Sequence, residues 1–344
     1  MVDQSLLTKV HELSDLELAV LLCLVSREHC LISTPSHVVD DLVLELQLVA
    51  ERTFGLEWTV IDCNPSTTLD DFVSALLGNP SITSHDPSDL SRISAENSHS
   101  RPSTRLTGTQ QEGKIVNFVI AKNLDQASQT VQIQALELLR TRRVFTHRSV
   151  QVAPKQFVFM PVIQAVKGGY AHVTQHLNDF LAMAHWHDPE HGFVNLEDSG
   201  KDEAQSNASN AKNEPLISED NLTSLREAAQ QVQVDIDVIR YQMNIVSFLR
   251  MHRAVAQGIT PMATKHFDQL MRNLAPLHKL EYVTPALVDL AAKKIYLHRI
   301  QITEPENERS MQWGSTLEAV TSLLDDIGPE EVIEETLEMV TAPV

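Results

Sequence analysis

The fold is decided by residues 114–163, KIVNFVIAKNLDQASQTVQIQALELLRTRRVFTHRSVQVAPKQFVFMPVI. The segment opens with an apolar, β-branched run over 115–120, which is short enough for a buried parallel strand. From residue 128 to 139 the apolar side chains recur at roughly helical spacing, and arginines follow where positive charge suits a helix C-terminus. A hairpin-like stretch around 146–149 and a second apolar run, 156–163, complete the segment. This order predicts an α/β unit of strand, helix, hairpin and strand.

The words VQIQALELLRTRRVF and APKQFVFMPVI in this segment resemble the stretch between the Walker B and sensor 1 motifs of AAA+ ATPases of the MoxR and magnesium-chelatase I-subunit clade. The resemblance implies an AAA+-like α/β fold, with a parallel-sheet nucleotide-binding core and an all-α lid domain after it. In that family the first strand ends in Asp-Glu and the second ends in Asn. Here Ala121 and Lys122 stand at the acidic positions, and Val162 or Ile163 stands at the Asn.

A short strand over 29–33 and a helix over 38–50 flank the place where the family has its phosphate-binding loop. An active loop carries glycines that let backbone amides approach phosphate, a Lys for the phosphates and a Ser or Thr for magnesium. When the family word GPPGTGKT is laid on this segment, Asp40 and Asp41 fall at the Lys and Thr, and carboxylates there repel a triphosphate. No GxxxxGK[ST] word occurs in the chain. The degenerate loop consists of Thr34, Pro35, Ser36, His37, Asp40 and Asp41.

Residues 217–302 are expected to be almost wholly helical. Pairs of a capping residue and Pro, Thr260-Pro261 and Thr284-Pro285, mark two helix starts. Four helices in this order, with GITPM at 258–262 and YVTP at 282–285, resemble the ChlI/MoxR lid, whose matching words are GASPR and YVTPxDV. The sensor 2 Arg of the family is then Met262. The Arg of the family word LDRF, which acts on the nucleotide of a neighbouring subunit, is Asp179.

The chain therefore departs from the family pattern at the loop Lys, the Walker B acids, sensor 1, the LDRF Arg and the sensor 2 Arg. Each change removes a group that binds or hydrolyses nucleotide, because phosphoryl transfer depends on positioning and electrostatic stabilisation. We expect a pseudo-ATPase with no catalytic residue, no metal site and no cofactor, acting as a scaffold or adaptor. The alternative is an ATP-dependent motor or chaperone subunit of the magnesium-chelatase or MoxR type, which would use ATP and Mg²⁺.

The length of 344 residues favours two compact units with loops. We expect a degenerate AAA+-like α/β core over 1–194, interrupted by a disordered insertion at 78–113 that is rich in Ser, Asn, Pro, Thr and Gly. A polar linker at 195–214 and a helical lid at 215–303 follow. An acidic tail with one or two helices, at 304–344, ends the chain.

The net charge of −19 lies mostly in that tail, where eleven acids face Arg309 alone and give −10. A broad nucleic-acid surface is not expected, because phosphate contacts need clustered Lys and Arg. No apolar run has the ~18 residues of a membrane helix, and no signal peptide is seen. Three cysteines without metal spacing, Cys23, Cys30 and Cys63, indicate a reducing compartment. The expected location is cytoplasmic or nuclear, and the expected partners are proteins, including copies of this chain or an active AAA+ relative.

Two further features leave alternatives open. The run His185-Trp186-His187-Asp188-Pro189-Glu190-His191 could bind zinc, but its spacing matches no strong metal signature, and a solvated loop is the favoured interpretation. In the tail, one helix either packs on the lid or serves as a helix that docks into a groove of a partner with basic residues at its rim.

Overall fold

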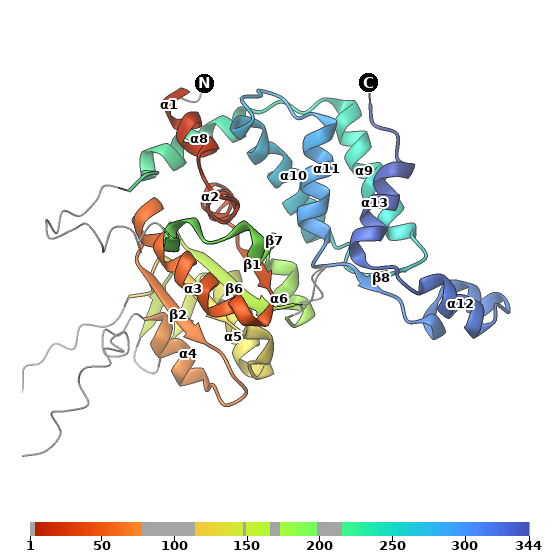
Figure 1. Cartoon of the computed structure of the whole chain (residues 1–344), viewed down its shortest axis with the longest axis horizontal. Helices are drawn as coiled ribbons and strands as arrows, with labels where there is room; N and C mark the ends of the chain where they lie inside the picture. Colours follow the sequence, from red (N-terminus) through yellow and green to blue (C-terminus); the bar gives the residue numbers. More distant parts are fainter. Residues whose placement is uncertain (1–3, 78–113, 147–148, 166–172, 198–214, 344) are drawn as a thin grey trace, which may run out of the picture.

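A five-stranded parallel sheet forms the centre of the computed structural model, which describes residues 4–77, 114–146, 149–165, 173–197 and 215–343. The strand order is β2-β3-β6-β1-β7, and all neighbouring strands run parallel, so their carboxyl ends meet at one edge (Figure 1). The predicted α/β core is confirmed. The insertion expected at 78–113 and most of the expected linker, 198–214, lie outside the described residues. The strands are β1 (Cys30–Thr34), β2 (Trp58–Asp62), β3 (Phe118–Lys122), β6 (Val158–Gln164) and β7 (Met183–Trp186).

Helices cover both faces of the sheet. Side chains of Phe118 and Ile120 pack with those of α2 and α3, whereas Val119 and Ala121 pack with α4, α5 and α6. This alternation follows from the pleat, because successive side chains of a strand point to opposite faces. It also explains why the strands read as continuous apolar runs. The helices are α2 (Asp15–Ser26), α3 (Val39–Leu48), α4 (Leu69–Leu76), α5 (Gln129–Thr141) and α6 (Gln175–Phe180).

The segment that decided the fold is built as the sequence predicts. Helix α5 ends at Arg142, whose backbone is left-handed with φ of 53°, and the chain turns directly into an antiparallel pair of strands. These strands are β4 (Arg143–Phe145) and β5 (Val150–Val152), and residues 147–148 between them lie outside the described part. Strand β6 then returns to the sheet beside β3.

The second half of the chain contains α8 (Glu219–Gln231), α9 (Ile236–Met251), α10 (Pro261–Leu277) and α11 (Pro285–Tyr296). Thr260 caps α10 as predicted, since its hydroxyl accepts from the Ala263 N–H at 3.0 Å. The expectation of an almost wholly helical region is wrong in one place, because β8 (Val255–Gln257) pairs antiparallel with β9 (Gln301–Ile302). Gly258 follows β8 with φ of 117°, and a Cβ there would lie 2.0 Å from the Arg299 carbonyl oxygen.

The acidic tail folds back on the helical region. After α12 (Leu317–Leu324), α13 (Pro329–Met339) packs on α9 and α11 and buries Val332 and Ile333. Lys293 of α11 donates to the Glu334 carboxylate at 3.0 Å. The tail helix α13 therefore packs on the helical region of its own chain. This was the first of the two alternatives expected from the sequence.

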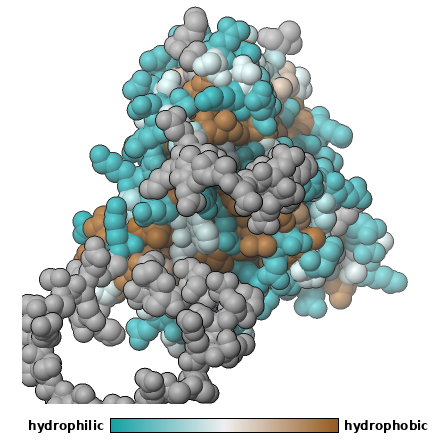
Figure 2. Space-filling model, turned by 60° about the vertical axis from the view of Figure 1, so that its left-hand side comes forward, coloured by the Kyte–Doolittle hydropathy of each residue, from teal (hydrophilic) through white to brown (hydrophobic). Residues whose placement is uncertain are grey.

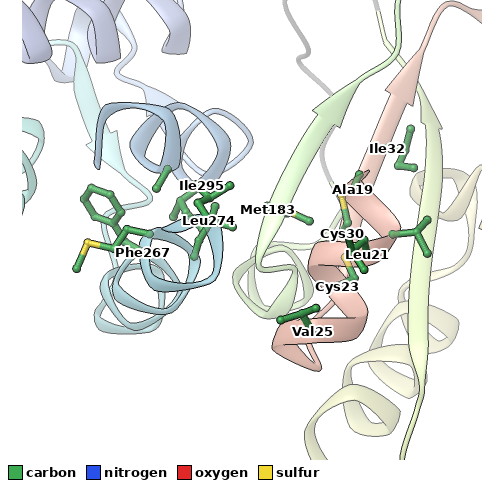
Figure 3. Packing of buried hydrophobic residues seen from close by; sticks show 14 of the residues in the cluster. Ala19, Leu21, Cys23, Val25, Cys30, Ile32, Met183, Phe267, Leu274 and Ile295 are labelled. Carbon is green, nitrogen blue, oxygen red and sulfur yellow. The ribbon is translucent and has the colours of Figure 1, made fainter. Parts of the chain in front are cut away.

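One apolar cluster joins the sheet to the helical region. Helix α2 lies between them, with Ala19, Leu21 and Cys23 near β1 (Figure 3). On the other side of Met183 lie side chains of α10 and α11, among them Phe267, Leu274 and Ile295. The three cysteines are buried and free, and they pack as small apolar residues.

Candidate functional site

The connection from β1 to α3 is closed around Thr34. This residue is fully buried, its hydroxyl donates to the His187 carbonyl at 3.1 Å, and its own carbonyl accepts from the Ala165 N–H at 3.0 Å. Only residues 35–38 separate the strand from the helix, and Ser36–Val38 form a 3-10 turn. A GxxxxGK[ST] loop relies on glycines and a longer backbone to surround phosphate. This four-residue connection contains no glycine.

Two carboxylates occupy the first turn of α3, where such a loop would hold an anion. Asp40 and Asp41 place negative charge at the helix N-terminus, which the helix dipole stabilises. Phosphate binds at helix N-termini for the same reason. The helix dipole therefore already has anionic partners within the chain.

A lysine lies opposite Asp40. Lys122, the last residue of β3, donates to Asp40 Oδ1 at 2.5 Å and lies 3.8 Å from Asp62 Oδ2 at the end of β2. The hydrogen bond that Lys122 donates to Asp40 is the main reason that the pKa of Lys122 is raised. The preceding residue, Ala121, is fully buried in the apolar cluster between the sheet and helices α4, α5 and α6. The sequence places a Lys where the family has an acid and an acid where it has a Lys, and the structure brings these two residues together.

At the end of β6 the exposed polar side chain is an uncharged amide. Val162 and Ile163 are buried, and the exposed residue after them, Gln164, is paired in register with Thr34. Gln164 donates to the side-chain oxygen of Asn123 at 3.1 Å. Sequence reasoning missed this pair, although Asn directly after a strand is a turn signal, and Asn123 has φ of 53°.

The position of the LDRF arginine holds an acid that binds within the chain. Asp179, in α6, accepts from the Thr260 hydroxyl at 2.5 Å and lies 3.6 Å from Arg299 Nε. The preceding Asn178 donates to the His298 carbonyl at 2.7 Å. Both residues therefore attach the core to the helical region. Met262 lies at the start of α10, two residues after Thr260, half-buried and without charge.

Arg299 is the centre of this joint and was not singled out from the sequence. It is 3% exposed, and burial lowers its pKa to about 10, so it is charged at neutral pH. Burial, and secondarily Arg299, lower the pKa of His266 to about 3, which leaves its ring neutral. Arg299 donates at 2.7 to 3.1 Å to the carbonyl oxygens of Asp179, Leu181, Ala182 and Ile295 and to His266 Nδ1.

The histidine-rich run 185–191 is only partly a loop. His185 and Trp186 belong to β7, and His185 and His187 are buried, so the prediction of a solvated loop is wrong for these residues. Pairing of β7 with β1, and packing of α11 on β7, cover them. Burial, then Lys294, lower the pKa of His185 to about 3. Within the described residues, no group of three His, Cys, Asp or Glu side chains is placed to hold a metal ion.

Comparison with known proteins supports the fold. No known family model matches the chain. The structure is similar to the crystal structure of a candidate ATPase from Cytophaga hutchinsonii, with a TM-score of 0.67, 14% identity and coverage of 99% of this chain and 94% of that one. The strand order and this similarity show an AAA+-like α/β core followed by a helical region. A full-length MCM homologue from Methanopyrus kandleri has a TM-score of only 0.44 at 11% identity, covering 86% of this chain and 59% of that one.

The sequence is also similar to a curated protein. It is "Maintenance of telomere capping protein 2" of Lachancea thermotolerans, which is 28% identical over 114 residues. The match covers 32% of this chain and 40% of the relative, so the chain spans well under half of the relative's length.

Proposed function

We propose that this AAA+-like chain is a non-catalytic pseudo-ATPase that acts as a scaffold or adaptor in a protein assembly. The ion pair between Asp40 and Lys122 carries the proposal. Hydrolysis needs positive charge at the start of the helix after β1, and acids at the end of β3 that serve magnesium and water. In this chain an acid, Asp40, stands at the start of the helix, and Lys122 stands at the end of β3. The two side chains neutralise each other's charge and not the charge of a bound ligand.

The other family positions support the same conclusion. Met262 is uncharged, Val162 and Ile163 are buried and apolar, and Asp179 binds Thr260 of its own chain. We therefore assign no catalytic residue and no cofactor. The proposal includes kinship with the MoxR and magnesium-chelatase clade. It also includes the domain boundaries drawn from that kinship.

The surface offers apolar side chains for protein partners. The β4–β5 hairpin exposes Phe145, Val150 and Val152 at about half of their area. Exposed apolar patches mark protein contacts more often than chance, and brown apolar surface is visible between hydrophilic residues in Figure 2. We propose protein partners, including further copies of this chain or an active AAA+ relative. No nucleic acid or membrane is part of the proposal.

The proposed location is the cytosol or nucleus. No helix of the described residues is long and apolar enough to cross a bilayer. The name of the Lachancea relative, which refers to telomere capping, favours the nucleus.

Nucleotide binding is tested by isothermal titration of the full chain with ATP and magnesium. We expect no heat of binding that depends on the β1–α3 connection. Asp40→Ala releases Lys122, whereas Asp41→Ala removes an equal charge without releasing it, so the two variants are a matched pair. Wild-type binding that changes in Asp40→Ala and not in Asp41→Ala would show a working nucleotide site and contradict the proposal.

The scaffold role is tested by affinity capture with the full chain as bait. Phe145→Glu places a charge in the apolar hairpin, and Trp313→Glu makes the same kind of change at a residue that is 88% exposed elsewhere. A protein retained by the wild type and by Trp313→Glu, but lost by Phe145→Glu, supports the role. Retention of the same protein by all three baits would exclude the hairpin as its contact.

The alternative is the ATP-dependent motor. Similarity to a candidate ATPase over 99% of this chain is the observation that favours it. At 14% identity that similarity concerns the fold, and the reversed charges favour the pseudo-ATPase over the motor.

A further inference from the structure

A pocket away from the family's nucleotide site lies where the C-terminus of α2 meets α8 and α10, which pack against one another. Its volume is about 430 Å³, which lies in the usual range for small ligands. Basic residues from all three helices line it. We call it the arginine pocket, and its polar lining includes Arg27, Arg226, Lys265, Asp268, Arg272 and Asn273.

The charge of this pocket is opposite to that of the whole chain. Four cations line it against one acid, whereas the chain has a net charge of −19. The acid, Asp268, is already engaged by Arg272 through two contacts of 3.1 and 3.2 Å. Arg27 and Lys265 form no salt bridge with any residue of the described part. From outside the lining, Glu219 attracts Arg226 and Glu28 attracts Lys265. Within the lining, the net positive charge remains available to an anion.

Two donors in the lining lack partners. Arg226 donates from Nη2 to the Leu24 carbonyl at 2.8 Å, which holds the guanidinium in place, while its buried Nε has no partner in the described residues. Asn273 is 7% exposed, and its Nδ2 likewise has none among them. Both atoms are buried in the wall of the pocket, and most buried polar groups are hydrogen-bonded, so the two unpaired donors mark this wall as an exception.

The backbone holds the cations close together. Arg27 ends α2 in the left-handed conformation with φ of 59°, and its carbonyl accepts from Arg142 Nη2 at 2.7 Å. On α10, Lys265, Asp268 and Arg272 follow one another at spacings that place them on one face. Arg27 lowers the pKa of Arg226 in addition to the larger effect of burial, and the Glu219 carboxylate acts in the opposite direction.

We propose that the arginine pocket binds a small, free phosphate-bearing anion through Arg27, Arg226, Lys265 and Arg272. Guanidinium groups match phosphate oxygens in pairs, and two phosphates in one ligand would engage more of the cations than one. The pocket adjoins the start of β1, whereas the degenerate loop follows its end, so a five-residue strand of roughly 15 Å separates the two. The proposal therefore stands independently of the proposed function.

The test is isothermal titration of the full chain with inorganic pyrophosphate in a buffer free of phosphate. The variant Arg27→Gln/Lys265→Gln removes two exposed cations of the pocket and no salt bridge. The control, Arg240→Gln/Lys293→Gln, removes two exposed cations of α9 and α11 outside it. We expect binding by the wild type and the control, and at least roughly tenfold weaker binding by the pocket variant, since tenfold corresponds to about 1.4 kcal/mol.

Three results would overturn the proposal. The first is no heat from the wild type at millimolar pyrophosphate. The second is equal weakening by the pocket and control variants, which would reveal a general effect of charge. The third is tighter binding of a phosphoserine peptide than of pyrophosphate, which would assign the pocket to modified proteins instead of free compounds.

Circular dichroism spectra that match the wild type confirm that each variant is folded.

Discussion

At the scale of single residues, Arg299 is expected to contribute most to the attachment of the helical region to the core. It donates to four carbonyl oxygens and to His266 from a buried position. Arg299→Met leaves these acceptors without a donor and should lower the free energy of unfolding by about 3 kcal/mol. Urea denaturation followed by circular dichroism measures the change. Arg240→Met, at an exposed salt bridge with Asp237, should cost less than about 0.5 kcal/mol; equal losses would contradict the role of Arg299.

His29 should make stability depend on pH. Burial, with smaller effects of Arg142 and His266, lowers its pKa to about 3, against about 6.5 in an unfolded chain. Between these values the unfolded state binds more protons, so the contribution of this group is complete above about pH 6.5 and is lost as the pH falls towards 3. Between pH 7 and pH 5, the wild type should lose about 2 kcal/mol more than His29→Gln.

The measurement is urea denaturation at several pH values. Gln retains an acceptor for the Phe159 N–H, which His29 Nδ1 accepts at 3.1 Å. His37→Gln, at an exposed histidine, is the control and should follow the wild type. Parallel pH dependences of the wild type and His29→Gln would refute a neutral buried His29.

At the scale of elements, α13 is a structural part of the helical region and not a free tail. Ile333 is 2% exposed in the apolar cluster, so Ile333→Ala should lower the free energy of unfolding by roughly 3 kcal/mol. Leu323→Ala on α12, where the side chain is 40% exposed, should cost clearly less. Thermal denaturation of the two variants decides the matter. A loss in Ile333→Ala no greater than in Leu323→Ala would indicate that α13 is detached in solution.

The elements that sequence reasoning found are those with local signals. Apolar runs predicted the strands β1, β3 and β6, and Thr followed by Pro predicted the helix starts at Thr260 and Thr284. Strand β7 was missed because His185 in the strand and His187 just after it look polar in sequence. Their burial comes from pairing with β1, about 150 residues earlier in the chain. The β8–β9 pair is likewise non-local.

The candidate site shows the same limit. The sequence shows that Asp40 and Lys122 carry charges opposite to those at the matching positions of the family. It does not show that these two residues, 82 positions apart, form an ion pair. It also gives no sign of the arginine pocket, whose cations lie on three helices far apart in the chain. Spatial pairs of this kind depend on the packing of the whole chain.

At the scale of the whole molecule, the core and the helical region should unfold together. One apolar cluster extends from Leu6 to Val340 and includes β1, β3 and β6 as well as α8 to α11. Tryptophan fluorescence and far-ultraviolet circular dichroism should therefore give coincident single transitions. Phe267→Ala, in the fully buried part of α10, should lower the midpoint for both probes equally. Two separated transitions would show that the parts are independently stable.

The reversed charges of Asp40 and Lys122 are most directly tested by release of phosphate from ATP with magnesium. The full-length wild type is measured beside Arg27→Gln/Lys265→Gln, so that phosphate binding in the arginine pocket is not mistaken for activity. We expect both proteins to release phosphate no faster than buffer, alone or at concentrations that favour self-association. Turnover by both proteins that is lost in Lys122→Ala would contradict the pseudo-ATPase and establish the motor.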